Sequence, residues 1–342
     1  MKLTELDFEL PTDLIAQQPA ERRDGSRMLV VDRDHGTLTD NGFGEIVEFL
    51  RRDDVLVLNN TRVFPARLQG TSETGATIEI FLVERDEDCL WTTLARPAKR
   101  LKPGKRIDFA EGFSATVIDR ADDGKTIVKF DADGDFFDRL ESIGQTPLPP
   151  YIKREGEEPA DRERYQTVFA KNRGAIAAPT AGLHFTPNIL GEIESRGIVI
   201  TELTLHVGYG TFEPVRVDDL TEHRVAPERY EISEAAADAL NKARQDNRRI
   251  VAVGTTSTRA LETTVKKYGR FVPGSHLADL TITPGYQFEA VAALLTNFHL
   301  PQSSLLLLTS TFGGHELIMS AYRHAVAKRY RFYSYGDCML II

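Results

Sequence analysis

Cysteine is scarce, since Cys89 and Cys338 are the only two in 342 residues. Two cysteines cannot make a disulfide framework or a cysteine-based zinc site. Long apolar runs are also lacking: the longest, around residues 305–308, is far below the roughly 20 residues that cross a bilayer. Residues 1–14 hold no apolar stretch typical of a secretory signal. We therefore expect a cytoplasmic, reduced, globular protein without membrane contact.

An excess of positive charge is lacking as well, because 42 Lys and Arg face 51 Asp and Glu, a formal net charge of −9. A nucleic acid partner would therefore have to bind to a local basic patch. The densest basic window is either the solvated rim of a β-domain or a contact to a phosphate backbone. Its basic side chains are those of Arg96, Lys99, Arg100, Lys102, Lys105 and Arg106.

Short strands dominate residues 66–132, with turn sequences such as Glu73-Thr74-Gly75 between them. This regular spacing favours a small antiparallel barrel or sandwich. On either side, apolar strands alternate with helical spacing, as in an α/β domain. We expect a discontinuous α/β domain of residues 1–65 plus 151–342 and an inserted, barrel-like all-β domain of residues 66–150 that ends in a helix. The six strand-like runs are 66–71, 77–84, 89–96, 105–109, 113–120 and 126–131.

Two predicted strands run straight into polar residues. Residues 250–253 are followed by Gly254-Thr255-Thr256-Ser257, with a helix expected from about 258 to 267. The N–H groups and hydroxyls there, aided by Arg259, can hold an anion, although an ordinary helix cap is the alternative. The sequence is neither a P-loop nor GxGxxG. The strand at 55–58 ends at Asn59-Asn60-Thr61-Arg62, where ligands bind in open α/β sheets.

Three of the eight histidines lie between apolar neighbours and shortly before a Gly or Pro: His184, His206 and His299. For a single histidine of this kind, a hydrogen-bonded place in the core is the simplest interpretation. General acid–base work near neutral pH is a second interpretation. A three-histidine metal site is a third, but the sequence has no i,i+4 His pair and no HxH spacing, so we expect no metal.

The segment 177–187 is apolar yet contains two Pro, a Gly, two Thr and His184. Such a mixture fits neither a plain core strand nor a plain surface loop, which indicates unusual backbone near a buried ligand. Residues 206–212 place two glycines around Tyr209, and glycines let backbone approach a ligand closely. We therefore expect 177–187, 206–208 and 297–299 to line one shared pocket.

Nine stretches together resemble one family: residues 26–30, 58–68, 147–152, 164–168, 178–186, 204–212, 252–257, 295–301 and 330–337. The chain is similar, nearly end to end, to the S-adenosylmethionine:tRNA ribosyltransferase-isomerases of queuosine biosynthesis. The chain departs from that family at Ala226 and Ala292, where a His and an Asp are usual.

The resemblance implies a reaction. The ribosyl moiety of S-adenosylmethionine is transferred to 7-aminomethyl-7-deazaguanine at the tRNA wobble position, which gives epoxyqueuosine and releases adenine and methionine. It also implies an α/β domain with an inserted β-barrel, tRNA and S-adenosylmethionine as partners, and no permanently bound cofactor. We expect a monomer.

The site residues follow from the motifs. We take His184 as the leading acid–base candidate, with His206 and His299 next, and the basic window as a tRNA contact. The expected substrate-binding residues are Asn60, Thr61, Arg62, Thr180, Phe185, Gly208, Tyr209, Thr211, Thr255, Thr256, Arg259, Asn297, Tyr335 and Asp337. A three-histidine metallohydrolase and an RNA-binding module without catalysis are the competing classes.

Overall fold

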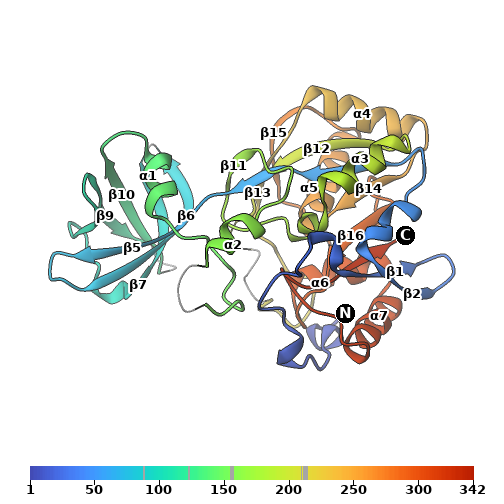
Figure 1. Ribbon diagram of the computed structural model, residues 1–342, viewed down its shortest axis with the longest axis horizontal. Helices are drawn as coiled ribbons and strands as arrows, with labels where there is room; N and C mark the ends of the chain where they lie inside the picture. Colours follow the sequence, from blue (N-terminus) through green and yellow to red (C-terminus); the bar gives the residue numbers. More distant parts are fainter. Residues whose placement is uncertain (88, 122–123, 155–157, 209, 211–214) are drawn as a thin grey trace.

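Two β-structures organise the chain, a nine-stranded mixed sheet and a closed six-stranded barrel set apart from it (Figure 1). The structure is a computed structural model that describes residues 1–342 except 88, 122–123, 155–157, 209 and 211–214. Both units are made by short apolar strands, as the sequence predicts. The expected fold class, an α/β main part with an inserted all-β barrel, is confirmed.

The large sheet has a parallel centre. Strands β12, β3, β14 and β16 lie side by side and parallel, so their carboxyl ends meet at one edge. Strand β17, close to the C-terminus, lies between β16 and β1. In spatial order the strands are β15 (Gly274–Ala278), β13 (Glu228–Ile232), β12 (Val199–Leu205), β3 (Val55–Asn59), β14 (Ile250–Val253), β16 (Ala293–Asn297), β17 (Cys338–Ile341), β1 (Arg27–Asp32) and β2 (Thr37–Gly42).

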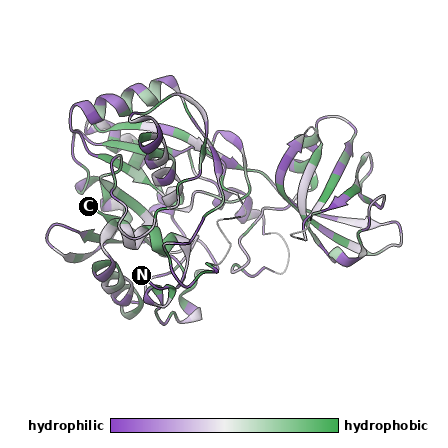
Figure 2. Cartoon of the chain, turned by 180° about the vertical axis from the view of Figure 1, so that it is seen from behind, coloured by the Kyte–Doolittle hydropathy of each residue, from purple (hydrophilic) through white to green (hydrophobic). Residues whose placement is uncertain are grey.

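Helices cover both faces of this sheet. Alternate residues of a strand point to opposite faces, so Val57 packs with helix residues such as Leu240, and Leu56 packs with Phe43 and Ile193. The first face carries α4 (Glu234–Gln245), α5 (Thr255–Tyr268), α6 (Ser304–Gly313) and α7 (His315–Ala327). The second carries α3 (Pro187–Ser195) and the 3-10 helix η4 (Phe43–Glu48). Figure 2 shows the apolar strands between helices with polar outer sides.

The barrel strands pair antiparallel throughout, with Leu68, Ile80 and Trp91 in the closed interior. Helix α1 (Phe136–Ile143) packs against this interior through Phe136 and Leu140. The strands are β5 (Arg67–Ser72), β6 (Thr77–Glu87), β7 (Leu90–Arg96), β8 (Arg106–Ala110), β9 (Phe113–Arg120) and β10 (Thr126–Ala132), with the 3-10 helix η5 (Ala98–Arg100) after β7.

The chain passes twice between barrel and large sheet. Strand β4 (Thr61–Val63), on the way out, pairs in parallel with β11 (Asn172–Ala175), on the way back. The returning segment also contains α2 (Pro159–Arg164), and the 3-10 helix η6 (Thr180–His184) follows. The division into residues 1–65 plus 151–342 and residues 66–150 stays a prediction. The remaining 3-10 helices are η1 (Leu3–Leu6), η2 (Thr12–Leu14) and η3 (Arg23–Gly25).

Local sequence signals succeed at some helix ends and fail at others. A serine before a helical stretch is a typical cap, and the Ser233 side chain does accept a hydrogen bond from the Ala236 N–H at the start of α4. Helix α5, however, begins at Thr255, three residues earlier than the prediction. His184 lies in a 3-10 turn, which agrees with the unusual backbone predicted for segment 177–187. Within the described parts of the chain, no helix is long and apolar enough to span a membrane.

Candidate active site

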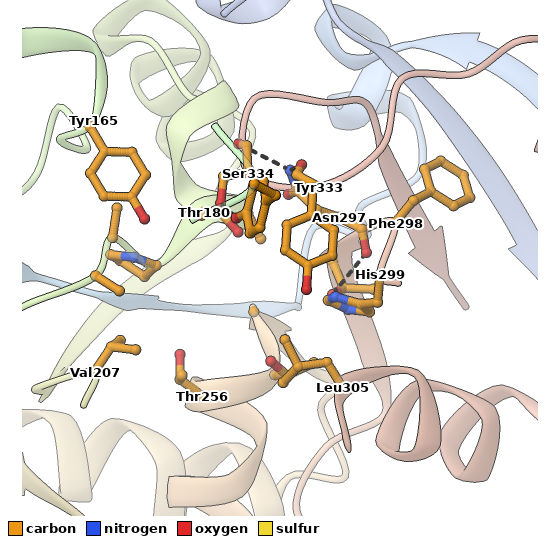
Figure 3. Close-up of a pocket in the computed structure, with 18 residues that line it drawn as sticks. Tyr165, Thr180, Val207, Thr256, Asn297, Phe298, His299, Leu305, Tyr333 and Ser334 are labelled. Carbon is orange, nitrogen blue, oxygen red and sulfur yellow. Dashed lines mark hydrogen bonds between the residues drawn. The ribbon is translucent and has the colours of Figure 1, made fainter. Parts of the chain in front are cut away.

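A cavity of about 60 Å³ lies where the parallel strands β14 and β16 end (Figure 3). This is the sheet edge at which α/β proteins bind ligands. Three segments expected to share a pocket do meet here, through residues 177–181, Val207 and 297–299. The lining residues are Tyr151, Tyr165, Ala177, Ala178, Pro179, Thr180, Ala181, Val207, Gly254, Thr255, Thr256, Thr296, Asn297, Phe298, His299, Leu305, Tyr333 and Ser334.

The first turn of α5 points at this cavity. Gly254 precedes the helix with φ 92° and ψ 153°, a conformation that is essentially reserved for glycine. The hydroxyls of Ser257 and Thr258 bond back to the carbonyls of Val253 and Gly254. Thr255 and Thr256 line the cavity. A helix N-terminus with free N–H groups favours an anion, so this turn suits a carboxylate or phosphate.

His299 is the one histidine of the three that lines the cavity. Its Nε2 lies 2.8 Å from Thr296 Oγ1, and its backbone N–H donates to the Tyr322 hydroxyl at 3.0 Å. Burial lowers the pKa of His299 to about 3, so the imidazole is neutral at pH 7.

His184 lies behind the cavity wall. Its Nδ1 is 2.7 Å from Ser26 Oγ, and its Nε2 is 3.2 Å from Asn297 Oδ1. The Asn297 side chain in turn donates through Nδ2 to the Tyr333 carbonyl at 2.8 Å. Burial lowers the pKa of His184 to about 4. Both ring nitrogens of His184 are thus within hydrogen-bond distance of protein side chains. His184 orients the cavity residue Asn297 and does not line the cavity itself.

His206 is placed in a third setting. Its Nδ1 lies 2.8 Å from Thr61 Oγ1, in the corner where β4 meets β11. A Cβ added to Gly174 would come within 2.5–2.7 Å of the His206 ring, so the glycine makes room for the imidazole. Burial lowers the pKa of His206. The three histidines thus have three separate sets of partners.

Tyrosines form much of the cavity wall, and the sequence analysis did not select them as site residues. Tyr151, Tyr165 and Tyr333 contribute their rings, and burial raises the pKa of each phenol well above its usual value. The Tyr165 hydroxyl is buried without a well-formed hydrogen bond to any residue that the structure describes. A buried hydroxyl beside a cavity is a natural partner for a ligand.

Comparison with known proteins places the whole chain in one family. The family described as "Queuosine biosynthesis protein" matches residues 3–341. The chain belongs to this family. Proteins named S-adenosylmethionine:tRNA ribosyltransferase-isomerase, from Syntrophotalea carbinolica and Symbiobacterium thermophilum, are 49% and 50% identical over 344 residues, with all of both chains covered.

A solved structure supports the same assignment. The crystal structure of S-adenosylmethionine tRNA ribosyltransferase from Thermotoga maritima is 37% identical, covers 99% of this chain and 100% of its own, and superposes with a TM-score of 0.56. The family resemblance drawn from the sequence motifs is thereby confirmed.

Arg259, expected to hold an anion, has protein partners instead. Its Nη1 is 2.6 Å from Glu228 Oε2, and its Nε and Nη2 donate to the carbonyls of Leu280, Ala226 and Ala278. The side chain is only 7% exposed. The guanidinium therefore ties α5 to β13 and its neighbours, and the anion prediction rests on Thr255 and Thr256 alone.

The polar residues after β3 form a buried network in place of an open binding edge. The side-chain oxygen Oδ1 of Asn60 accepts from Thr204 Oγ1 at 2.7 Å and from Asn172 Nδ2 at 3.3 Å, and its Nδ2 donates to Glu202. Arg62 is exposed and 3.9 Å from Glu141. None of Asn60, Thr61 or Arg62 lines the cavity.

Other expected binding residues also lie outside the cavity lining. Phe185 is fully buried in the core under α3. The Tyr335 hydroxyl donates to Asp161, and Asp337 accepts from Arg27 and from the Arg331 N–H. The Gly208 N–H donates to Glu228, whereas Tyr209 and Thr211 lie outside the described residues. Thr180, Thr255, Thr256 and Asn297 do line the cavity.

The basic window is divided among several environments. Lys105 pairs with Glu73 at 2.8 Å and Arg106 with Asp108 at 2.8 Å, so both charges are locally compensated. Lys99 and Lys102 are exposed, and the side chain of Arg100 lies outside the described part. Arg96 lines a groove beside the barrel.

A smaller space of about 20 Å³ adjoins the cavity across Leu305, Thr255 and Thr256, which line both. His223 lies in it, with Nε2 2.7 Å from Ser304 Oγ. Among the residues that the structure describes, no group of three or more His, Cys, Asp or Glu side chains is arranged to hold a metal ion.

Proposed function

We propose that this chain is an S-adenosylmethionine:tRNA ribosyltransferase-isomerase. The observation that carries the proposal is the 49–50% identity, over the full length of both chains, to relatives of that name. The enzyme transfers the ribosyl moiety of S-adenosylmethionine to the 7-aminomethyl-7-deazaguanine of a precursor tRNA. The products are epoxyqueuosine in the tRNA, adenine and methionine. S-adenosylmethionine is a co-substrate, no permanently bound cofactor is required, and the enzyme acts as a cytoplasmic monomer.

The cavity suits the chemistry of S-adenosylmethionine. Its described lining contains aromatic rings and no Asp, Glu, Lys or Arg side chain. Aromatic faces attract a sulfonium without pairing its charge permanently. The first turn of α5, with Thr255 and Thr256, faces the same space and favours the methionine carboxylate.

The co-substrate can extend from the cavity into the adjoining smaller space, because Thr255 and Thr256 line both. Leu305 separates the cavity from the smaller space around His223. A change in the Leu305 rotamer would join the two spaces beside the α5 N-terminus.

Proton transfer is the first chemical requirement, because a base must take the acidic C5′ proton beside the sulfonium. Among the described lining residues, only His299 and the three tyrosines can accept or give a proton. His299 is neutral at pH 7, and its pKa of about 3 keeps a lone pair available while making it a weak base. We assign proton transfer to His299. His184, the leading candidate from the sequence, is assigned to positioning Asn297 and, through it, the segment of Tyr333.

One experiment tests the function: incubation with S-adenosylmethionine and tRNA carrying the aminomethyl precursor base, with adenine as the readout. We expect adenine to be released only when both substrates are present. Binding of tRNA without adenine release would instead support the RNA-binding module, and loss of activity on chelation would support the metallohydrolase.

A further inference from the structure

A groove of about 510 Å³, separate from the cavity, runs between the barrel and the segment that leads back to the large sheet. Figure 1 shows this returning segment, which begins after α1, between the two units. The floor of the groove is the outer face of β5, β6 and β7, and its wall is formed by residues 145–150 and 152–154. The reaction proposed above leaves this groove without a role.

The floor is a grid of outward-facing side chains set by the strand register. In one row, Arg67 of β5 lies opposite Phe81 of β6, which lies opposite Leu94 of β7. In the next row, Gln69, Glu79 and Arg96 lie opposite one another in the same way. A partly exposed aromatic ring thus lies between an apolar and a cationic neighbour, the arrangement on which single-stranded nucleic acids stack their bases.

The arginines on this floor are well suited to bind an anionic ligand. Arg67 lies 3.6 Å from Glu79 and 3.5 Å from the Leu148 carbonyl, and its guanidinium carbon is 5.9 Å from the centre of the Phe81 ring. Its buried Nε has no hydrogen bond to a described residue. Arg96 is exposed at the end of β7. The groove contains more cations than carboxylates although the chain carries a net charge of −9. Its charged side chains are Arg67, Arg96, Lys153 and Arg154 against Glu79 and Asp161.

The wall is hydrogen-bonded to the floor and lies close to the active-site cavity. Arg67 and Gln145 exchange backbone hydrogen bonds of 3.3 and 2.8 Å, which fixes the wall to the floor. Pro150 and Ile152 line the groove, whereas Tyr151 between them lines the cavity. The segment of residues 150–152 therefore separates the groove from the active-site cavity.

We propose that this groove binds one unpaired nucleotide of the substrate tRNA, next to the nucleotide that is modified. The base stacks on Phe81, and Arg96 and Arg67 contact its phosphate. Successive unpaired nucleotides splay apart when proteins recognise RNA loops, so one can enter the cavity while its neighbour lies across Tyr151 in the groove. The proposal rests on the proposed function, because it takes the substrate to be tRNA.

The first test compares groove variants with matched controls on the same barrel. Phe81→Ala should weaken binding of the precursor tRNA about 10-fold or more, the usual loss when a base loses its aromatic partner, and Phe81→Tyr should restore it. Arg96→Ala should lower the slope of log Kd against log salt by about 0.7 to 1. The controls Ile118→Ala and Lys129→Ala remove an exposed apolar and an exposed basic side chain elsewhere on the barrel and should change neither quantity.

The second test identifies the ligand as a base. A tRNA with an abasic nucleotide beside the modified position, on either side, should bind the unaltered protein about 10-fold more weakly than the complete tRNA. The same abasic change should have little further effect on Phe81→Ala, because the stacking partner is already gone. Affinity for S-adenosylmethionine should stay constant in every variant, which shows that the fold is intact.

Several outcomes would overturn the proposal. If Phe81→Ala binds tRNA as tightly as Ile118→Ala does, no base stacks on Phe81 and the proposal is wrong. The proposal is also wrong if abasic substitution weakens tRNA binding by Phe81→Ala as much as it weakens binding by the unaltered protein. If Phe81→Ala weakens binding of polyglutamate but not of tRNA, the groove docks an acidic protein and the proposal is wrong. Adenine release by the unaltered protein distinguishes failure of the proposed function from failure of the groove proposal. If the unaltered protein releases no adenine, the proposed function is wrong, whatever the groove variants do.

Discussion

Lowering the pH from 6.5 to 5 destabilises the α/β part of the molecule through His184 and His299. Both imidazoles are buried, and burial lowers their pKa values to about 4 and about 3, against 6.5 in an unfolded chain. Over this pH range the unfolded state binds a proton at each histidine and the folded state does not. Stability is therefore complete above pH 6.5 and falls as the pH drops towards the folded pKa values.

The size of the effect follows from the same values. Each pH unit across which only the unfolded histidine is protonated costs about 1.36 kcal/mol. The unfolded histidine is half protonated at pH 6.5 and almost fully protonated at pH 5, so each histidine lowers the free energy of unfolding by about 1.6 kcal/mol over this range. His184→Gln should remove the contribution of His184, so that the stability of the variant falls by about 1.6 kcal/mol less than that of the unaltered protein.

Urea unfolding at a series of pH values measures this. Helix circular dichroism follows the α/β part, which holds α3 to α7, whereas fluorescence of Trp91, the single tryptophan, follows the barrel. Carboxylate titration is common to both proteins and cancels when the two pH profiles are compared. The reasoning is wrong if the free energy of unfolding from helix circular dichroism changes with pH in the same way for His184→Gln and the unaltered protein. It is also wrong if the substitution changes the pH dependence of the Trp91 signal alone.

Three further outcomes are expected. His299→Gln should lower kcat for adenine release by about 100-fold or more with KM for S-adenosylmethionine nearly unchanged, whereas His184→Gln should lower it by about 10-fold; equal losses would contradict the separate roles. Gly254→Ala should cost about 1–3 kcal/mol of stability in urea unfolding, because φ 92° strains any residue with a Cβ, and no loss would contradict this. Arg259→Met should cost about 3–5 kcal/mol by removing the cation that faces the buried Glu228 carboxylate, and a smaller loss for Arg259→Met with Glu228→Gln would confirm that the charge is the cause.

The barrel could be predicted almost strand by strand from the sequence. Its strands β5 to β10 follow one another directly with turn sequences between them, so the position of each strand is local information. The pairs β5–β8 and β7–β10, which join strands that are not consecutive, could not be predicted in this way. The order of the large sheet could not be predicted in this way. Strand β17 lies between β16 and β1. Strand β3 precedes the barrel strands in the sequence, yet it pairs with β12 and β14, which follow them. These pairings therefore depend on tertiary packing.

The candidate site was predicted by segment better than by residue. Segments 177–181 and 297–299 do meet, but the 3-10 turn of η6 rotates His184 behind the wall, and strand alternation does not foresee such a turn. Tyr151 and Tyr333 come from irregular chain, where no periodicity says which way a ring points. The only signal for these two tyrosines was that they lie in the family-like stretches 147–152 and 330–337.

The central place of β17 has a consequence for how the protein is made. Residues 338–341 supply neighbours for both β16 and β1, so the nine-stranded sheet stays in two parts until these residues have been synthesised. The barrel, whose strands end at residue 132, can close long before that. Domains fold in order as they emerge during synthesis. The barrel is therefore folded while the large sheet is still incomplete. Nascent chains that stop short of residue 338 expose the apolar edges of β16 and β1 to other chains.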